Sequence, residues 1–248
     1  MNTILTVNGL SVFHQQSEHY LLEDIDFSLS KGQVLALVGS SGSGKSLLAQ
    51  AILQLLPENL CYKGEVLYSG RQVNHYDRGK NIVLIPQSVE ALDPLMKVGK
   101  QIEGLIQTED SHQVMLDLLA RLGLKAEIAA RYPFQLSGGQ ARRVLAAIAL
   151  GSSASIVIAD EPTPGLDKEA KNEMIALLKE VQQAGKAILL ITHDFDAVLQ
   201  LADRVAVLYQ GSIVEVTDAN HFSGDGQKLA HPFTKALWQS LPQNSFIK

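Results

Sequence analysis

The chain has 248 residues, of which 46% are hydrophobic, so it is long enough to bury a substantial core in one domain. Its 26 acidic and 21 basic side chains give a formal net charge of -5, which excludes a global basic footprint for nucleic acid. The single cysteine, Cys61, excludes an internal disulfide framework and fits a reducing compartment, and we expect it to be a small packed residue.

The sequence predicts neither a signal peptide nor a membrane span. Met1–Val7 lacks a basic start followed by a long apolar stretch. The apolar runs are only about five residues long, whereas a bilayer-spanning helix needs about 20. We therefore expect any membrane association to come through a partner.

Alternation of apolar and polar residues near the N-terminus is typical of antiparallel strands. It predicts strands at Ile4–Val7, Leu10–Phe13 and Ile25–Leu29. Short runs that are apolar on both faces predict the buried strands of a parallel sheet. These runs are Val34–Val38, Ile82–Ile85, Ser155–Ala159 and Ala187–Ile191.

Helical spacing and good helix formers predict helices at Ser46–Leu56 and Glu169–Ala184, between the buried strands. This alternation indicates an α/β sandwich. From Pro94 to about Gly151 the pattern changes to helices alone, which predicts a helical insertion. The helices of this insertion are expected at Val98–Gln107, Ser111–Leu122 and Gly138–Leu150. Outside the insertion, one more short helix is expected near the C-terminus, at Pro232–Leu241.

A glycine-rich loop between the first buried strand and the helix after it fits the pattern G-x-x-x-x-G-K-[ST]. Its residues are Gly39, Ser40, Ser41, Gly42, Ser43, Gly44, Lys45 and Ser46. Such a loop wraps its backbone N–H groups around phosphates, and the helix N-terminus adds positive potential there. We expect Lys45 to reach the β- and γ-phosphates of ATP and the Ser46 hydroxyl to bind Mg²⁺.

Two carboxylates follow the strand Ser155–Ala159, at the end where they are costly unless they meet a cation or a polar ligand. Asp160 is placed to hold Mg²⁺, and Glu161 is placed to polarise the attacking water as general base. The alternative is that Asp160 merely caps a helix. Its place beside the phosphate loop favours the catalytic interpretation.

The pentapeptide Leu136–Gln140 resembles the signature motif of the ATP-binding cassette superfamily, with which the chain aligns over nearly its full length. Ser137 is suited to cap the next helix, and Gly138 and Gly139 expose its first N–H groups. In the family, Ser137, Gly138, Gly139 and Gln140 would complete the ATP site of the opposite subunit. ATP binding would close two such subunits, and hydrolysis would reopen them.

The resemblance implies a P-loop NTPase (RecA-like) core sandwich with an N-terminal antiparallel β subdomain and an inserted α-helical subdomain. One ATPase domain would span 1–248. Its core would comprise 1–87 and 152–215, its helical subdomain 88–151 and a C-terminal extension 216–248.

The resemblance also assigns further site residues. Gln87 matches the loop that senses Mg²⁺ and the attacking water, and His193 matches the switch histidine that contacts the γ-phosphate. Leu47 is expected among the nucleotide contacts. The aromatic ring that stacks on adenine is expected to be Phe13, with Tyr20 as the alternative. Pro164–Asp167 departs from the usual Ser-Ala-Leu-Asp at its first two residues.

Three stretches are similar to the peptide and nickel importer subfamily. They are Glu90–Leu95, Tyr132–Gln135 and His231–Leu237. The peptide branch usually has a longer, cysteine-containing tail, so we expect nickel or a metallophore as cargo, with oligopeptides as the alternative. Rival functions are a DNA-repair or chromosome ATPase, which would need coiled coils or zinc modules, and a ribosome-associated factor, which would need two cassettes.

Such importers would pair this chain with a second, paralogous ATPase subunit and two permease subunits, and with an extracytoplasmic binding protein indirectly. No nucleic-acid partner is expected. The chain would lie at the cytoplasmic face of the inner membrane, and the permease would dock near Gln87–Leu95. Leu92, Leu95 and Met96 are expected either to be exposed in the docking groove or to pack within the insertion.

Overall fold

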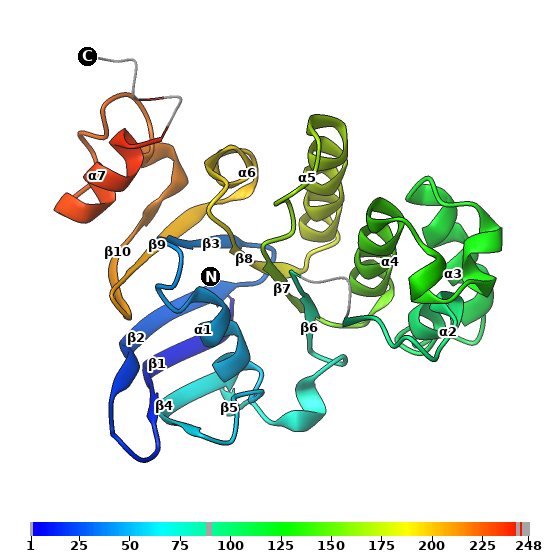
Figure 1. The fold of residues 1–248 in the computed structure, drawn as a ribbon, viewed down its shortest axis with the longest axis horizontal. Helices are drawn as coiled ribbons and strands as arrows, with labels where there is room; N and C mark the ends of the chain where they lie inside the picture. The colour runs from blue at the N-terminus through cyan, green and yellow to red at the C-terminus, as the bar shows by residue number, and fades with distance from the viewer. Residues whose placement is uncertain (1, 88–90, 242–243, 245–248) are drawn as a thin grey trace.

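The fold is given by a computed structural model that describes residues 2–87, 91–241 and 244. It is an α/β structure with a mostly parallel sheet, a separate antiparallel sheet and a group of helices at one side (Figure 1). The expected α/β core with an antiparallel sheet and a helical insertion is therefore confirmed. Glu90, which begins one of the stretches similar to importers, lies outside the described residues.

Among the described residues, six strands form the larger sheet in the order β10-β9-β3-β8-β7-β6. Neighbouring strands in it are parallel except for the antiparallel pair β9 and β10. The strands are β3 (Val34–Gly39), β6 (Ile82–Ile85), β7 (Ile156–Asp160), β8 (Ala187–Ile191), β9 (Arg204–Tyr209) and β10 (Ser212–Asp218). β3 and β8 are buried along their whole length, as runs that are apolar on both faces predict.

The antiparallel sheet has the order β2-β1-β4-β5. Its strands are β1 (Thr3–His14), β2 (Tyr20–Ser30), β4 (Leu60–Tyr68) and β5 (Arg71–Gln72). The expectation of two strands at Ile4–Val7 and Leu10–Phe13 is wrong, because β1 runs through both. The pairing of β1 shifts register between them, and Gly9 there has φ +55°, so a bulge interrupts the alternation without ending the strand.

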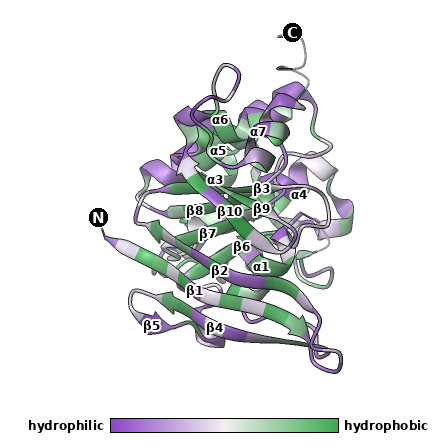
Figure 2. Ribbon diagram, turned by 90° about the vertical axis from the view of Figure 1, so that its left-hand side faces the viewer, coloured by the Kyte–Doolittle hydropathy of each residue, from purple (hydrophilic) through white to green (hydrophobic). Residues whose placement is uncertain are grey.

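Helix α1 (Lys45–Ile52) lies between the two sheets, and α5 (Lys168–Gln183) and α6 (Phe195–Leu201) cover the opposite face of the larger sheet (Figure 2). Leu48 and Ile52 of α1 are fully buried with Leu5 of β1 and Leu35 of β3. Helix α1, which follows the phosphate loop, is therefore held in place by apolar contacts with both sheets.

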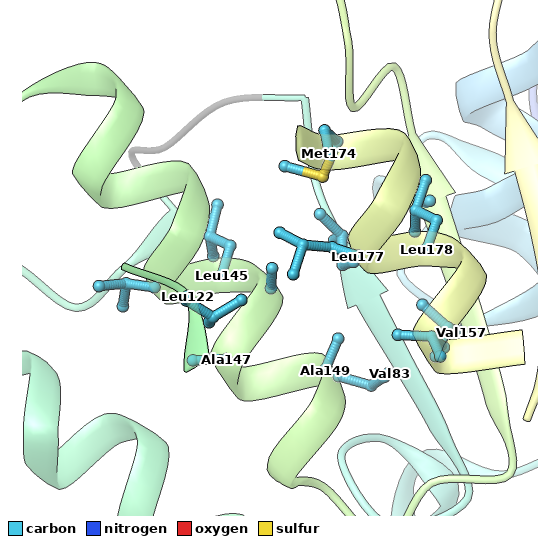
Figure 3. Packing of buried hydrophobic residues seen from close by; sticks show 14 of the residues in the cluster. Val83, Leu122, Leu145, Ala147, Ala149, Val157, Met174, Leu177 and Leu178 are labelled. Atoms are coloured by element: carbon cyan, nitrogen blue, oxygen red, sulfur yellow. The ribbon is translucent and has the colours of Figure 1, made fainter. Parts of the chain in front are cut away.

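The helical insertion contains α2 (Val98–Glu103), α3 (Ser111–Arg121) and α4 (Gly138–Gly151), with short 3₁₀ helices at Ala126–Ala130 and Pro133–Gln135. Its buried side chains share one cluster with the edge of the larger sheet and with α5. Figure 3 shows Leu145 of α4 and Met174 of α5 within this cluster. Lys186, just before β8, donates to the carbonyls of Ala149 and Ser152 at 3.0 and 2.5 Å, which anchors the C-terminal end of α4.

Of the two interpretations left open for Leu92, packing within the insertion is confirmed, because its exposed fraction is 2% and it packs into the same cluster. Leu95 and Met96 are exposed by 87% and 42%. Packing within the insertion therefore applies to Leu92, whereas exposure applies to Leu95 and Met96.

The C-terminal part packs helix α7 (Pro232–Gln239) onto α6 and the 3₁₀ helix Ala219–His221. Trp238 of α7 has its ring centroid 6.0 Å from that of Phe195 and 5.7 Å from that of Phe222. Within the part of the chain that the structure describes, no helix is both long and apolar enough to cross a bilayer.

Candidate active site

The order of strands in the larger sheet brings three segments to one edge. β3, β8 and β7 are neighbours, and all three are parallel, so their carboxyl ends meet. These ends lead into the Gly39–Ser46 loop, into Thr192 and His193, and into Glu161 after Asp160. Ligands of open α/β sheets bind at this edge.

The Lys45 side chain lies folded over the phosphate loop. Its Nζ donates hydrogen bonds to the carbonyl oxygens of Gly39 and Ser40, both at 3.0 Å. Burial lowers the pKa of Lys45, while the negative charges of Glu161 and Asp160 oppose that shift. The charged form of this ammonium would therefore be stabilised by an anion that enters the loop.

Close packing around the loop requires glycine at two positions. A Cβ at Gly39 would lie 2.2 Å from the carbonyl oxygen of Leu208, and a Cβ at Gly44 would lie 2.6 Å from Leu22 Cδ2. The Ser43 hydroxyl in the same loop is buried and has no hydrogen-bond partner within the described residues. Within the described residues, one buried polar group of this loop is thus left unsatisfied.

Ser46 and Asp160 face each other across the edge of the sheet. The Ser46 hydroxyl donates to Asp160 Oδ1 at 3.1 Å. Burial raises the pKa of Asp160, and the hydrogen bond from Ser46 only partly offsets the shift. Mg²⁺ in phosphate sites takes one or two carboxylates, with phosphate oxygens and waters completing its shell. The hydroxyl and the poorly solvated carboxylate fit such an ion.

Glu161 is held by its neighbours in an uncommon backbone conformation. Its φ is +47°, and its N–H donates to the Ile191 carbonyl at 2.8 Å. Its Oε1 lies 2.9 Å from His193 Nδ1, and Thr192 Oγ1 donates to its Oε2 at 3.2 Å. The side chain of Glu161 is 10% exposed, whereas that of His193 is 67% exposed. The carboxylate is therefore fixed, and the imidazole extends toward solvent.

A cavity of about 790 Å³ opens above these groups. Its walls include most of the predicted nucleotide and catalytic residues: Gly39, Ser40, Ser41, Gly42, Gly44, Lys45, Ser46, Leu47, Gln87, Glu161 and His193. Phe13, Ser43 and Asp160 are not among its lining residues, although Asp160 reaches it through Ser46. The volume suits a nucleotide-sized ligand, since ligand pockets measure about 300–1,000 Å³.

Sequence reasoning missed the apolar parts of this wall, which are Leu21, Phe195, Leu237 and Leu241. A helix at Pro232–Leu241 was expected, but its position depends on how Trp238 packs against α6, and no local pattern gives that. Leu21 follows Tyr20 directly on β2. Because Tyr20 is a candidate for base stacking, this neighbouring position is the sequence feature that could have indicated Leu21 as part of the nucleotide site.

Phe13 and Tyr20, the two candidates for base stacking, lie against each other with ring centroids 5.4 Å apart. Tyr20 is 39% exposed, and Phe13 is partly buried. The pair stands on adjacent strands next to Leu21 of the cavity wall. Both rings thus remain candidates.

The Ser137–Gln140 motif lies away from this cavity, at the N-terminus of α4. Ser137 Oγ accepts from the Gln140 N–H at 3.3 Å, and Gln140 Oε1 accepts from the Ser137 N–H at 3.0 Å. This capping box confirms the expected cap. Ser137, Gly138 and Gly139 are exposed, and nothing lies within 4 Å of a Cβ built on either glycine. The helix start is therefore open to a ligand from outside the subunit.

Comparison with known proteins gives consistent matches. The family described as ABC transporter matches residues 22–164. The oligopeptide transport ATP-binding protein OppD of Bacillus subtilis is 37% identical over 96% of this chain and 72% of its own length. The glutathione import ATP-binding protein GsiA of Escherichia coli is 34% identical over 99% of this chain, but only 43% of its own length is covered.

Solved structures agree with the fold. An ATP-binding cassette solved as a dimer in a post-hydrolysis state, bound to ADP and Pi, has a TM-score of 0.75 at 25% identity. The match covers 87% of this chain and 99% of that one.

Proposed function

The chain belongs to the ABC transporter family as one of its ATPases, and from that premise we propose that it powers the import of short peptides into a bacterial cell. The observation that carries the proposal is the convergence of Lys45, the Ser46–Asp160 pair and the Glu161–His193 pair around one nucleotide-sized cavity. Each group has a separate task in phosphoryl transfer.

ATP would lie with its phosphates in the loop Gly39–Ser46. Entry of the phosphates would draw the Lys45 ammonium away from the two carbonyls that it now contacts. Ser46 and Asp160 would hold Mg²⁺, which neutralises phosphate charge when bound. Gln87 lines the same cavity and is placed to reach that ion or the attacking water. The base would stack on Phe13 or on Tyr20.

Glu161 is the residue proposed to orient and polarise the attacking water. Its carboxylate is fixed by Thr192 and by His193, so little reorganisation is needed during the reaction. The exposed His193 ring would also contact the γ-phosphate. These contacts support a general base whose carboxylate is already positioned before ATP binds.

Hydrolysis is proposed to need a second cassette. The open helix start at Ser137–Gly139 suits a phosphate, but it lies outside the cavity of its own subunit. Two cassettes facing each other would place this motif over the partner's ATP, and the similar solved cassette bound to ADP and Pi is itself a dimer. We propose a paralogous second cassette, with a second copy of this chain as the alternative.

The permease subunits would hold the ATPase at the cytoplasmic face of the membrane, with the binding protein on the other side. Leu95 and Met96, exposed shortly after Gln87, support a docking surface on this side of the helical insertion. This surface follows the cavity residue Gln87 in the sequence, and we propose that a permease helix bound there responds to the nucleotide.

Peptides are favoured over nickel as cargo, because relatives named for oligopeptide transport and glutathione import match most of this chain. Uptake of labelled short peptides and of nickel, compared between cells with and without the gene, tests this choice. Peptide uptake that is lost with the gene and restored by the wild-type chain, but not by Glu161→Gln, is the expected result. Loss of nickel uptake alone would replace peptides with nickel, and copurification with DNA or ribosomes instead of permeases would overturn the transport function.

A further inference from the structure

Arg142 occupies a position in the fold that the phosphate chemistry above does not use. It lies on α4, five residues after the capping Ser137, and the residue is partly buried. Its Nη1 atom is buried and finds no hydrogen-bond partner within the described residues. A buried guanidinium nitrogen without a partner costs free energy, so its surroundings must supply an acceptor.

Arg142 also lines a small cavity. The volume of this cavity is about 10 Å³, and its polar lining residues are Arg142, Gln87 and Glu161. The apolar walls include Leu145 of α4 and Met174 of α5, which lie in the packed cluster between these helices (Figure 3). A volume of this size holds a single water molecule when two or more polar groups face it.

The other guanidinium nitrogen lies close to the turn that follows the catalytic carboxylate. A Cβ built on Gly165 would have Arg142 Nη2 as its nearest neighbour, at 3.9 Å. Arg142 therefore shares the small cavity with Glu161 and lies close to Gly165 of the turn Pro164–Asp167. It does so from a helix whose far end is anchored by Lys186.

We propose that Arg142 is a positioning residue that ties the start of α4 to Glu161 of the same subunit through one buried water molecule. The water accepts from Arg142 Nη1 and donates to the carboxylate of Glu161 or to the side-chain oxygen of Gln87. When Ser137 of this subunit contacts the nucleotide bound to the facing subunit, the contact is transmitted through about one turn of α4 and through Arg142 to Glu161, the general base of this subunit. This inference rests on the proposed function, because it gives the bridge a role in ATP hydrolysis.

Arg143, the next residue, provides a matched control. It lies on the same helix but forms an ion pair with Glu173 of α5 at 2.5 Å, and it does not line the small cavity. Arg143→Met removes an arginine of α4 without touching the bridge. Arg142→Met removes the donor and keeps an unbranched side chain, and Arg142→Lys keeps a cationic donor.

The test has a structural part and a kinetic part. A crystal structure of the full chain that resolves ordered water should show one molecule within hydrogen-bonding distance of Arg142 Nη1, and this molecule should be missing from Arg142→Met. ATP hydrolysis by the transporter assembled with its copurifying subunits should fall about tenfold in kcat for Arg142→Met, with KM changed less than about twofold. Arg142→Lys should recover most of the loss, and Arg143→Met should stay near wild type.

An empty cavity in the wild-type structure overturns the water bridge. A wild-type kcat for Arg142→Met, or an equal loss for Arg143→Met, overturns the positioning role. Absence of ATP binding by the wild-type protein would instead remove the proposed function, and the crystallographic result would still decide whether the bridge exists.

Discussion

Glu161 Oε1 lies 2.9 Å from Nδ1 of His193, and the two residues come from the ends of neighbouring parallel strands. The histidine is mostly exposed, whereas the carboxylate is almost buried. The pair thus combines a fixed carboxylate base with an imidazole that is exposed enough to contact a bound phosphate. This arrangement gives the first prediction.

Glu161→Gln should keep ATP binding and lose turnover. The amide keeps the shape of the side chain and can still contact Thr192 and His193, but it cannot polarise water as a carboxylate does. We expect kcat to fall by about 100-fold or more in the assembled transporter, with ATP affinity close to wild type. Steady-state hydrolysis and equilibrium ATP binding measure the two quantities. Turnover at the wild-type rate would remove Glu161 from the role of base.

Phe13→Ala should weaken ATP binding more than Tyr20→Ala does. Stacking on a base contributes about 1–3 kcal/mol, which corresponds to an affinity change of roughly 5- to 150-fold. Because the two rings contact each other, the smaller effect should come from the ring that only supports its neighbour. Titration of each variant with a fluorescent ATP analogue makes the comparison. The reverse order would assign the stacking role to Tyr20.

Gly39→Ala should damage the fold at the phosphate loop, whereas Gly42→Ala should not. A methyl group at Gly39 would lie 2.2 Å from the Leu208 carbonyl, and one at Gly42 would meet nothing within 4 Å. Since backbone cannot move away cheaply, we expect Gly39→Ala to lower Tm by about 5 °C or more. Gly42→Ala should cost only the strain of its positive φ. Thermal unfolding followed by circular dichroism distinguishes the two.

Asp77 should make folding stability depend on acid pH. Its side chain is 2% exposed, and hydrogen bonds from Arg71, from the Asn74 N–H and from Asn81 lower its pKa, against the effect of burial. A carboxyl with a lowered folded-state pKa contributes stability above its unfolded value of about 3.9 and loses it as pH falls toward the folded value.

Asp77→Asn should therefore cost about 1–3 kcal/mol near pH 7. The difference from wild type should shrink between about pH 4 and pH 2, because Asp77 of the unfolded wild type takes up a proton over this range, whereas the variant has no carboxyl at this position. Urea unfolding at several pH values measures it. A difference that stays constant over that range would mean that the charge of Asp77 is not what stabilises the fold.

Much of the fold and the site follows from local sequence. The strand Val34–Gly39, its loop and the helix after it are predicted by an apolar run, by glycines and by helix formers that all indicate the same structure. The carboxylates of Asp160 and Glu161, at the end of β7, lie where a parallel sheet must place them. These residues combine independent local signals, so tertiary context did not change the outcome.

Other parts depend on long-range packing. β4 was missed because Val66 is its only buried residue among the nine, and pairing with β1 makes it a strand. β9 contains only a short apolar run, Val205–Leu208, which periodicity does not distinguish from a helix segment. The sequence left the exposure of Leu92 open, and the insertion folds back over it. The position of Leu237 in the cavity wall depends on contacts across the chain.

Equilibrium binding of Mg-ATP to purified Glu161→Gln protein, with and without Lys45→Ala, tests the central claim most directly. The account predicts saturable binding by the single variant and affinity at least about tenfold weaker in the double variant, because the buried ammonium meets the phosphates. Equal binding by both folded proteins, or no binding by either, would contradict it.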